Sequence, residues 1–288
     1  MSIDLDAAAT FVAKHGRTLD WRRFRHLLGA AGTEQVLAAL DAYRNPDEGY
    51  GWGLEPDLRS VTSQPVAAMH ALEVLAEVGE TGSRTVRLFD WLGAHSLGDG
   101  GIPFALPFAD IDGSAPHWTT ADPDESSLQM TTQLAAQAHR IARHRPELAG
   151  HPWLAGATGY CLGVIDGLAG APSAYELMFV MRFLDAVPDA GALLERMAAF
   201  VRTDGPTPVG GTDGEVLHPL AFTPHPDGPS RELFSKEAIA ADVERLSAGQ
   251  QADGGWTVDF PAYSAVAALE WRAYATVESV RILRGSLS

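Results

Sequence analysis

The chain repeats one turn sequence at intervals of about fifty residues. The clearest copy, "AGQQADGGWTVDF", follows a segment with helical periodicity and places an Asp-Gly-Gly turn before a tryptophan. Because one of the intervals is close to two periods, a degenerate unit is expected near residue 150. A repeat of this length indicates an array of supersecondary units that bury their apolar faces against one another. The aspartates in this frame are Asp47, Asp99, Asp204 and Asp253, at intervals of 52, 105 and 49 residues.

Each unit has the pattern of one helix, a turn and a second helix. Glycine suits the turn because it accepts positive φ, and aspartate can accept hydrogen bonds from nearby backbone N–H groups. The first helices, such as "TEQVLAALDAY", are amphipathic, whereas the second, such as "TSQPVAAMHALEVLAEVG", are apolar on more than one face. We therefore expect an all-α fold in which five to six helical hairpins close into an α/α toroid, with the amphipathic helices outside. No linker rich in Pro, Gly or Ser separates two halves, which favours a single domain over residues 1–288.

The spacing in the last copy resembles a known motif. Leu246, Gln250, Gly254 and Trp256 look like the QW repeat of squalene and hopene cyclases. The resemblance implies the α/α toroid that class II terpenoid cyclases share with the β subunits of protein prenyltransferases. It also implies structural rather than catalytic roles for Gln250 and Trp256. The earlier copies are incomplete, with Arg44 and Ser96 at the glutamine position and Tyr50 and Ile102 at the tryptophan position.

The segment "ADPDESSLQMTT" resembles the DxDD motif with which class II cyclases protonate an alkene or an epoxide, although Glu stands in the last place. The resemblance implies that Asp124 donates the proton and that Asp122 and Glu125 orient or polarise it. Such an acid needs a neighbouring acceptor and a dry site. The same residues also suit the start of a helix, where Asp122 or Asp124 would be the N-cap and Glu125 would lie beside the positive helix end. Both interpretations stay open.

Three long connections rich in Pro and Gly carry aromatic and histidine side chains, and connections of this length tend to be functional. In a toroid they would gather at one mouth. Aromatic faces there would hold an apolar ligand or stabilise a carbocation, or they would plug the end of the barrel as a satellite core. The candidate substrate-binding residues are Tyr50, Trp52, Phe104, Phe108, His117, Trp118, Phe222 and His225.

Charge and cysteine content argue against several classes of protein. The formal net charge of −16 would repel nucleic acid and anionic membrane surfaces. No apolar run reaches the length of a membrane span, and no basic segment precedes an apolar core at the N-terminus, so a soluble cytoplasmic protein is expected. The single cysteine, Cys161, precludes an internal disulfide, and no cofactor or metal site is expected. Arg59 is isolated, which argues against a diphosphate-bearing substrate.

Three functions fit these observations. The first is a small enzyme resembling a class II terpenoid cyclase, which would protonate an apolar isoprenoid. The second is a noncatalytic toroid that binds an apolar ligand or a peptide. The third is a carbohydrate enzyme of the α/α-barrel type, which needs paired carboxylates across a groove; the repeat resembling the QW motif argues against it. The residues that could serve the third are Glu55, Asp57, Asp110 and Asp112, with Trp52 stacking on a sugar. Oligomeric state is left open.

Overall fold

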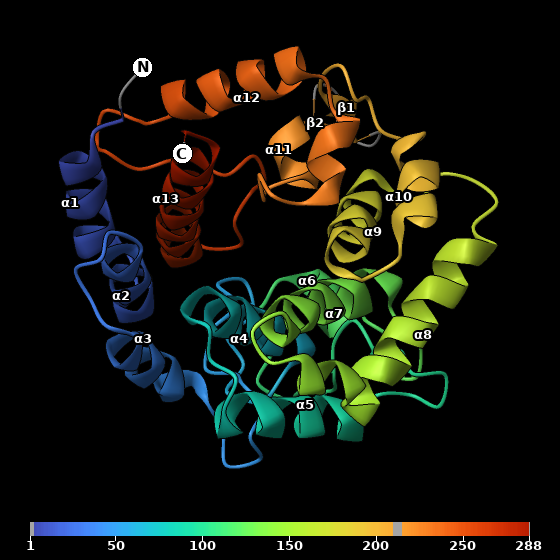
Figure 1. Ribbon diagram of the computed structural model, residues 1–288. Helices are drawn as coiled ribbons and strands as arrows, with labels where there is room; N and C mark the ends of the chain where they lie inside the picture. The colour runs from blue at the N-terminus through green and yellow to red at the C-terminus, as the bar shows by residue number, and fades with distance from the viewer. Residues whose placement is uncertain (1–2, 210–214, 288) are drawn as a thin grey trace.

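The helices of the computed structural model form a closed ring of two layers (Figure 1). The structure describes residues 3–209 and 215–287. The outer layer consists of α1 (Leu5–His15), α2 (Thr18–Leu27), α3 (Thr33–Leu40), α5 (Ser83–His95), α8 (Pro152–Gly167), α10 (Gly191–Ala198) and α12 (Lys236–Ala248). The inner layer consists of α4 (Pro65–Val78), α7 (Leu128–Ala142), α9 (Ala174–Ala186), α11 (Pro219–Phe222) and α13 (Ala265–Leu287). The expected all-α fold is confirmed, and each outer helix from α3 onward forms a hairpin with the next inner helix.

Short elements connect the layers. They are the helix α6 (Pro116–Thr119), the 3₁₀ segments η1 (Asp41–Tyr43), η2 (Pro146–Gly150) and η3 (Pro229–Leu233), and the strands β1 (Thr207–Pro208) and β2 (Val216–Leu217). The strands pair antiparallel, with Thr207 opposite Leu217. This ladder lies in the connection between α10 and α11 and leaves the fold class unchanged (Figure 1). Within the described residues, no helix is long and apolar enough to cross a membrane.

Local sequence explains where the inner helices begin and end. Pro65 occupies the first turn of α4, where the backbone N–H that it lacks would have no helical partner. Gly79 ends α4 in the left-handed conformation, with φ at 67°. Ser127 is the N-cap of α7, and its hydroxyl accepts a hydrogen bond from the Met130 N–H at 3.1 Å. Because α4 is apolar on more than one face, it is buried along most of its length, as expected for an inner helix.

Three copies of the repeated turn share one geometry. In each copy the aspartate Oδ1 accepts a hydrogen bond from the backbone N–H two residues later, and the residue between them has positive φ. The bonded pairs are Asp47 with Gly49 (3.0 Å), Asp99 with Gly101 (3.0 Å) and Asp253 with Gly255 (3.1 Å). The residues between them are Glu48, Gly100 and Gly254, with φ of 71°, 91° and 94°. The turn sequence thus specifies a local structure that recurs around the ring.

Two regions of the repeat depart from this geometry. At Asp204, the residue two positions later is Pro206, which has no N–H to donate, so the same turn cannot form. The Asp204 carboxylate instead lies 3.5 Å from the guanidinium of Arg202. Near residue 150 the chain forms the outer helix α8, and residues 168–173 connect it to α9 without an aspartate. The helical hairpins therefore continue through parts of the chain that lack the turn sequence.

The last copy of the turn closes the ring onto the N-terminal helix. A Cβ atom on Gly254 would lie 2.3 Å from the Ala7 carbonyl O in α1, so only glycine fits there. Gln250 accepts a hydrogen bond from the Asp4 N–H and donates one to the Asp4 carbonyl O, both at 2.8 Å. The Trp256 indole N–H donates to a carbonyl at the end of α12 at 2.7 Å. Both Gln250 and Trp256 therefore hold backbone segments in place.

An apolar cluster seals this junction between the two ends of the chain. Phe11 of α1 and Phe24 of α2 pack with Trp256 and with Val277 and Leu283 of α13, and all five are almost completely buried. A larger core runs through the remaining hairpins. Each fully buried side chain of this size stabilises the fold by about 1.5–3 kcal/mol relative to an exposed one. The ring is thus closed by apolar contact as well as by hydrogen bonds.

Candidate ligand-binding site

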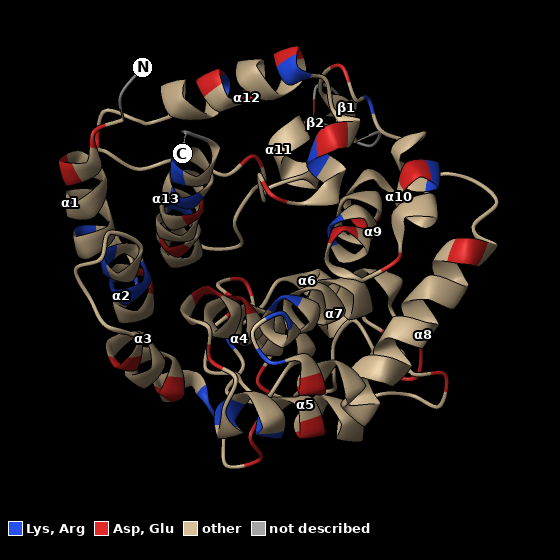
Figure 2. Cartoon of the chain, in the orientation of Figure 1, with Lys and Arg blue, Asp and Glu red and all other residues tan. Residues whose placement is uncertain are grey.

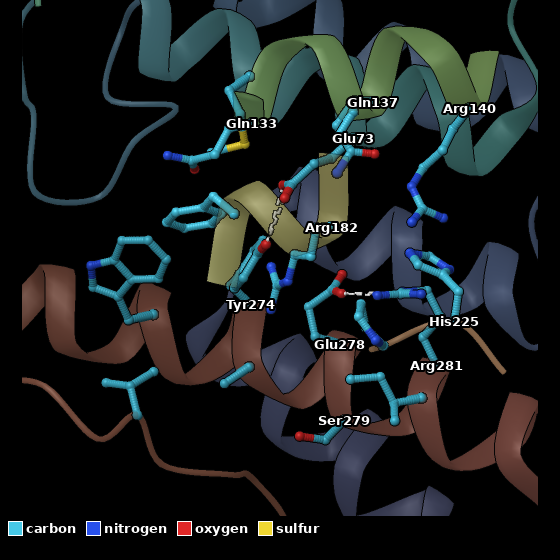
Figure 3. Close-up of a pocket in the computed structure, with 18 of the residues that line it drawn as sticks. Glu73, Gln133, Gln137, Arg140, Arg182, His225, Tyr274, Glu278, Ser279 and Arg281 are labelled. Carbon is cyan, nitrogen blue, oxygen red and sulfur yellow. Dashed lines mark hydrogen bonds and ion pairs between the residues drawn. The ribbon is translucent and has the colours of Figure 1, made fainter. Parts of the chain in front are cut away.

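A cavity of about 270 Å³ lies in the lumen of the ring, between α4, α7, α9 and α13 (Figure 3). His225, after α11, and Phe260, before α13, complete its wall. An adjoining cavity of about 330 Å³ shares Glu73, Arg140 and Arg281 with it. Figure 2 shows both signs of charge on α9 and α13, although inner helices of this fold are largely apolar. The lumen is therefore a chamber with both charged and apolar walls, of the size that suits a small molecule.

Positively charged side chains from different helices meet in one half of the cavity. Arg140 comes from α7, Arg182 from α9 and Arg281 from α13. His225 faces Arg140 from the segment after α11 (Figure 3). These residues are far apart in the sequence, so no local basic run marks the site. Their convergence attracts anions locally, in a chain whose formal net charge is −16.

The three arginines differ in how many of their side-chain N–H groups already make hydrogen bonds. Arg281 is paired with Glu278 through two nitrogens, Nε at 3.1 Å and Nη2 at 2.5 Å from Oε2. Arg140 Nη2 lies 3.7 Å from Asp185 Oδ2, which is beyond hydrogen-bond distance. Arg182 Nε donates to a backbone carbonyl of α11 at 2.7 Å, and no carboxylate of residues 3–209 or 215–287 lies within 4.0 Å of its guanidinium. Arg140 and Arg182 therefore retain N–H groups that can bind a ligand.

The pKa values of these groups shift in different directions: burial lowers those of Arg140, Arg182 and His225, whereas for Arg281 burial is outweighed by the charge and hydrogen bond of Glu278, which raise the pKa. Burial lowers the pKa of Arg140 to about 10, and it also lowers the pKa of Arg182. For His225, burial is the largest cause of a pKa well below the ordinary value, and the nearby Arg140, Arg281, Arg182 and Arg143 lower it further. The arginines stay charged at neutral pH, whereas the His225 imidazole is neutral. A bound anion would relieve the repulsion among these groups.

A chain of hydrogen bonds occupies the other half of the cavity. The Tyr274 hydroxyl donates to Glu73, at 3.0 Å from Oε1 and 3.2 Å from Oε2 (Figure 3). Glu73 Oε2 lies 2.9 Å from His70 Nδ1, and His70 Nε2 lies 2.8 Å from Glu55 Oε2. Burial would lower the pKa of His70, but the hydrogen bonds and charges of Glu55 and Glu73 outweigh it and raise the pKa to about 9. The imidazole is therefore protonated at neutral pH and holds both carboxylates.

Aromatic side chains form an apolar wall beside this chain. The Trp271 indole N–H donates to Asp57 Oδ2 at 2.7 Å, which fixes the orientation of the ring. The rings of Phe260 and Tyr274 stand perpendicular to Trp271, at centroid distances of 5.1 and 5.5 Å. Asp57 Oδ1 also accepts a hydrogen bond from the Tyr263 N–H at 2.8 Å, which anchors the segment before α13. The cavity thus combines an aromatic wall with a group of cations.

Asp124 and its neighbours lie outside the lumen, at the surface before α7. The side chains of Asp122, Asp124 and Glu125 are exposed, and Asp122 Oδ1 accepts a hydrogen bond from the Asp124 N–H at 2.9 Å. Asp122 and Glu125 border a surface cavity of about 450 Å³ beside Phe104. The N-cap of α7 is Ser127, so neither Asp122 nor Asp124 caps this helix. Solvent surrounds Asp124, whereas protonation of an alkene requires a dry site.

Of the eight loop residues expected to bind a ligand, His225 lines the lumen cavity and the other seven do not. Tyr50 and Phe222 are fully buried in the core. Trp52 is 55% exposed, has φ at 57°, and donates its indole N–H to Asn45 at 2.7 Å. These three side chains have structural or surface positions.

The remaining four residues form an aromatic cluster around α6. Phe104 stacks on Trp118 at a centroid distance of 4.8 Å, and His117 packs against Trp118 at 4.7 Å. Phe108 and Trp118 border a further cavity of about 250 Å³. Phe104 and Phe108 are partly buried against the main core. This packing corresponds to the satellite core that was the alternative to a binding site.

The carboxylates considered for sugar chemistry do not face each other across a groove. Glu55 and Asp57 are buried behind the lumen wall, where they hold His70 and Trp271. Asp110 accepts hydrogen bonds from the Ser60 hydroxyl and the Val61 N–H, both at 2.8 Å, and Asp112 is exposed. Glu55 and Asp57 support the candidate site from behind, a role that sequence reasoning did not assign to them.

Most of the lumen residues were missed by sequence reasoning. The signal for them is a charged residue inside an otherwise apolar inner helix, as with Arg182 in "YELMFVMRFLDAV". Burying a charge is costly, so such a residue needs a buried partner or a ligand. The charged residues missed in this way are Glu73, Arg140, Arg182, Glu278 and Arg281, and the neutral Tyr274 was missed with them.

The polar groups of the cavity suit an anion better than a metal ion. Across the described part of the chain, no group of three or more His, Cys, Asp or Glu residues is arranged to hold a metal. Cys161 is buried, and burial raises the pKa of its thiol, which disfavours the thiolate that binds metals. Cationic N–H donors, in contrast, are ligands for carboxylate, sulfonate and phosphate groups.

Comparisons with known proteins establish the fold alone. No protein-family model matches the chain, and no curated protein matches it. The chain is similar to a protein from Actinoplanes whose crystal structure is known, with 13% sequence identity and a TM-score of 0.57. The similarity covers 99% of this chain and 98% of that chain. The complete ring is therefore an arrangement that another protein shares.

Proposed function

We propose that the lumen binds a small amphiphilic organic anion. The observation that carries this proposal is the convergence of Arg140, Arg182 and His225 on one cavity. Among residues 3–209 and 215–287, the Arg140 guanidinium, the two terminal nitrogens of Arg182 and the His225 ring make no hydrogen bond. Arg140 and Arg182 are partly buried, and an anionic ligand would accept the hydrogen bonds that their remaining N–H groups can donate. A charge-assisted hydrogen bond contributes about 1.5–3 kcal/mol, so two such arginines can account for useful affinity.

The shape of the cavity supports a ligand with two different ends. The donors approach from α7, α9 and the segment after α11, so they suit a tetrahedral head group with several oxygens better than a planar carboxylate. Trp271, Phe179 and Phe260 supply apolar surface for a ring or a branched alkyl group. A pure hydrocarbon would leave the guanidinium groups dehydrated and unpaired. An isoprenoid or aromatic compound with an acidic head group satisfies both halves.

Binding of benzenesulfonate tests the proposal, because this probe combines an aromatic ring with a tetrahedral anion. Isothermal titration calorimetry should detect binding of benzenesulfonate, and binding of neutral benzenesulfonamide should be weaker by tenfold or more, on the order of one charge-assisted hydrogen bond. The variant Arg182→Met should weaken benzenesulfonate binding by roughly tenfold to a hundredfold. Arg202→Met is the matched control, because the Arg202 side chain is 59% exposed and lies outside the lumen.

Two outcomes would contradict the proposal. One is the absence of binding by benzenesulfonate, phenylphosphonate and inorganic sulfate alike. The other is binding that Arg182→Met and Arg202→Met weaken to the same extent, because a general loss of positive charge rather than the lumen would then explain the effect.

A further inference from the structure

His225 occupies an unusual position for an imidazole. It lines both lumen cavities, and the segment that carries it follows the short helix α11. Its ring makes no hydrogen bond to any residue in 3–209 or 215–287. The ring is half-buried at the cavity wall, so its nitrogens can interact with a molecule in the lumen.

Cations and carboxylates face His225 from every inner element that lines the two cavities. The carboxylates among them are already engaged: Glu73 by Tyr274, Glu77 by Arg23, and Glu278 by Arg23 and Arg281. The exposed carboxylate of Asp227 lies on the same segment as His225. The full set comprises Glu73 and Glu77 of α4, Arg140, Arg143 and His144 on or directly after α7, Arg182 and Asp185 of α9, Asp227, and Glu278 and Arg281 of α13.

The arginines of this set keep His225 neutral in the empty lumen. Burial is the main cause of its lowered pKa, and Arg140, Arg281, Arg182 and Arg143 follow as the charges that add to it. No carboxylate contributes a compensating attraction of comparable size, because each is bound to a cation or a hydroxyl group or lies in solvent. Near neutral pH the imidazole therefore gains a proton only when negative charge enters the cavity.

We propose that anion binding in the lumen is coupled to the uptake of one proton by His225, so that the site takes up an oxoanion and a proton together. This inference rests on the proposed function, because it requires an anion in the lumen. The oxoanion stays deprotonated, the proton comes from the solvent, and a second N–H bond forms on the imidazole. The imidazolium then donates a charge-assisted hydrogen bond to the ligand.

Linkage fixes the direction of the pH dependence. His225 has a lower pKa in the empty lumen than beside a bound anion, so the complex holds more protons than the free protein does. Affinity for an anion of constant charge therefore rises as the pH falls through the pKa of the complex. Because one proton is taken up, the affinity rises by at most about tenfold for each pH unit. The affinity stops rising once the pH is below the pKa of His225 in the empty site. A sulfonate is the appropriate probe, because its own charge is constant between about pH 5 and 8.

Calorimetric titration with benzenesulfonate in two buffers of different ionisation enthalpy measures the proton directly. We expect the intact protein to take up as much as one proton per ligand at the acidic end of this range. The variant His225→Gln should bind benzenesulfonate without proton uptake and with an affinity that hardly changes with pH. The variant His144→Gln, which removes the other imidazole of the adjoining cavity, should keep the uptake.

The possible failures are distinguishable. If benzenesulfonate, phenylphosphonate and sulfate all fail to bind, the proposed function fails. If benzenesulfonate binds without proton uptake, or if uptake persists in His225→Gln, the coupling proposal is overturned while lumen binding stands. An NMR pH titration of the His225 ring in the unmodified protein provides a second measurement, since its pKa must rise when benzenesulfonate is added. An unchanged pKa also overturns the proposal.

Discussion

The repeated turns and the lumen wall use the same kinds of polar residue in opposite ways. In the last turn, Asp253 accepts a hydrogen bond from the N–H of Gly255, two residues later. In the lumen wall, Tyr274 binds Glu73 across 201 positions of the sequence. Each turn satisfies a backbone N–H locally, and its aspartate also binds a side chain farther along the chain, such as Arg272 for Asp253. The lumen depends on the closed ring and still leaves Arg182 without a carboxylate within 4.0 Å among the described residues. The contrast separates polar residues that build the fold from polar residues that can bind a ligand.

The segment around Asp124 resembles the turns, because its polar residues bind neighbouring backbone groups rather than facing the lumen. Its hydrogen bond joins Asp122 to the Asp124 N–H, two residues apart, and its side chains are exposed. The carboxylates of Glu55 and Glu73 are buried or nearly so, and both bind one imidazole. Acidic residues that are adjacent in the sequence thus indicate a functional site less well than acidic residues that the fold brings together.

The largest effect is expected from a substitution in a turn. Gly254→Ala should lower the free energy of unfolding by about 4 kcal/mol, because φ is 94° and the added Cβ would lie 2.3 Å from a backbone oxygen of α1. Chemical denaturation measures the change. Gly163→Ala is the control: Gly163 lies within α8, a Cβ there meets nothing within 4 Å, and the variant should be more stable by up to about 1 kcal/mol. Equal stabilities of the two variants would mean that the last turn does not close the ring.

A substitution in the lumen wall should have the next largest effect. His70→Gln leaves Glu55 and Glu73 without their shared cation and should lower the free energy of unfolding by about 3 kcal/mol near neutral pH. The folded pKa of about 9 lies above the usual value of 6.5, so this stabilisation is complete below about pH 6.5. It is lost as the pH rises through about 9. Thermal unfolding between these pH values should show a decline in the intact protein and a flatter profile in His70→Gln. Parallel profiles would show that His70 does not hold the carboxylates.

Substitutions of Arg23 and Arg182 compare an arginine that is paired with carboxylates and one that is not. Arg23 binds Glu77 and lies 2.8 Å from Glu278, so Arg23→Met leaves the partly buried Glu77 without its cation, while Glu278 keeps Arg281, and should cost about 2 kcal/mol of stability. Arg182→Met leaves no carboxylate unpaired among the described residues, so it should change stability by less than about 1 kcal/mol. Denaturation of both variants measures the difference. A similar large loss in both would show that Arg182 is part of the structural network.

The smallest effect is expected at the surface acid. Asp124→Asn should change the free energy of unfolding by less than about 0.5 kcal/mol and should leave benzenesulfonate binding unchanged, because the Asp124 side chain is exposed and lies outside the lumen. Denaturation and calorimetry check both statements. A clear loss of ligand binding in Asp124→Asn would place this segment in the binding site.

More of the fold than of the candidate site could be predicted from the sequence. The period near fifty residues and the two types of helix were sufficient for an all-α ring, since both signals come from neighbouring residues. The turn at Asp204 and the unit near residue 150 were less well predicted, because Pro206 abolishes one turn and residues 168–173 lack the aspartate of the other. The site itself depends on contacts such as the one between Asp57 and Trp271, 214 positions apart, which no local pattern encodes. Of the candidate ligand-binding residues, His225 alone lines the lumen cavity.

The position of a bound probe tests the central claim most directly. In a crystal of the protein grown with 4-bromobenzenesulfonate, anomalous scattering locates the sulfur and the bromine separately. We expect the sulfur beside Arg140, Arg182 and His225, and the bromine toward Trp271. A probe bound in the surface cavity next to Asp122 and Glu125, or a lumen without the probe at saturating concentration, would contradict the claim that the lumen binds an amphiphilic anion.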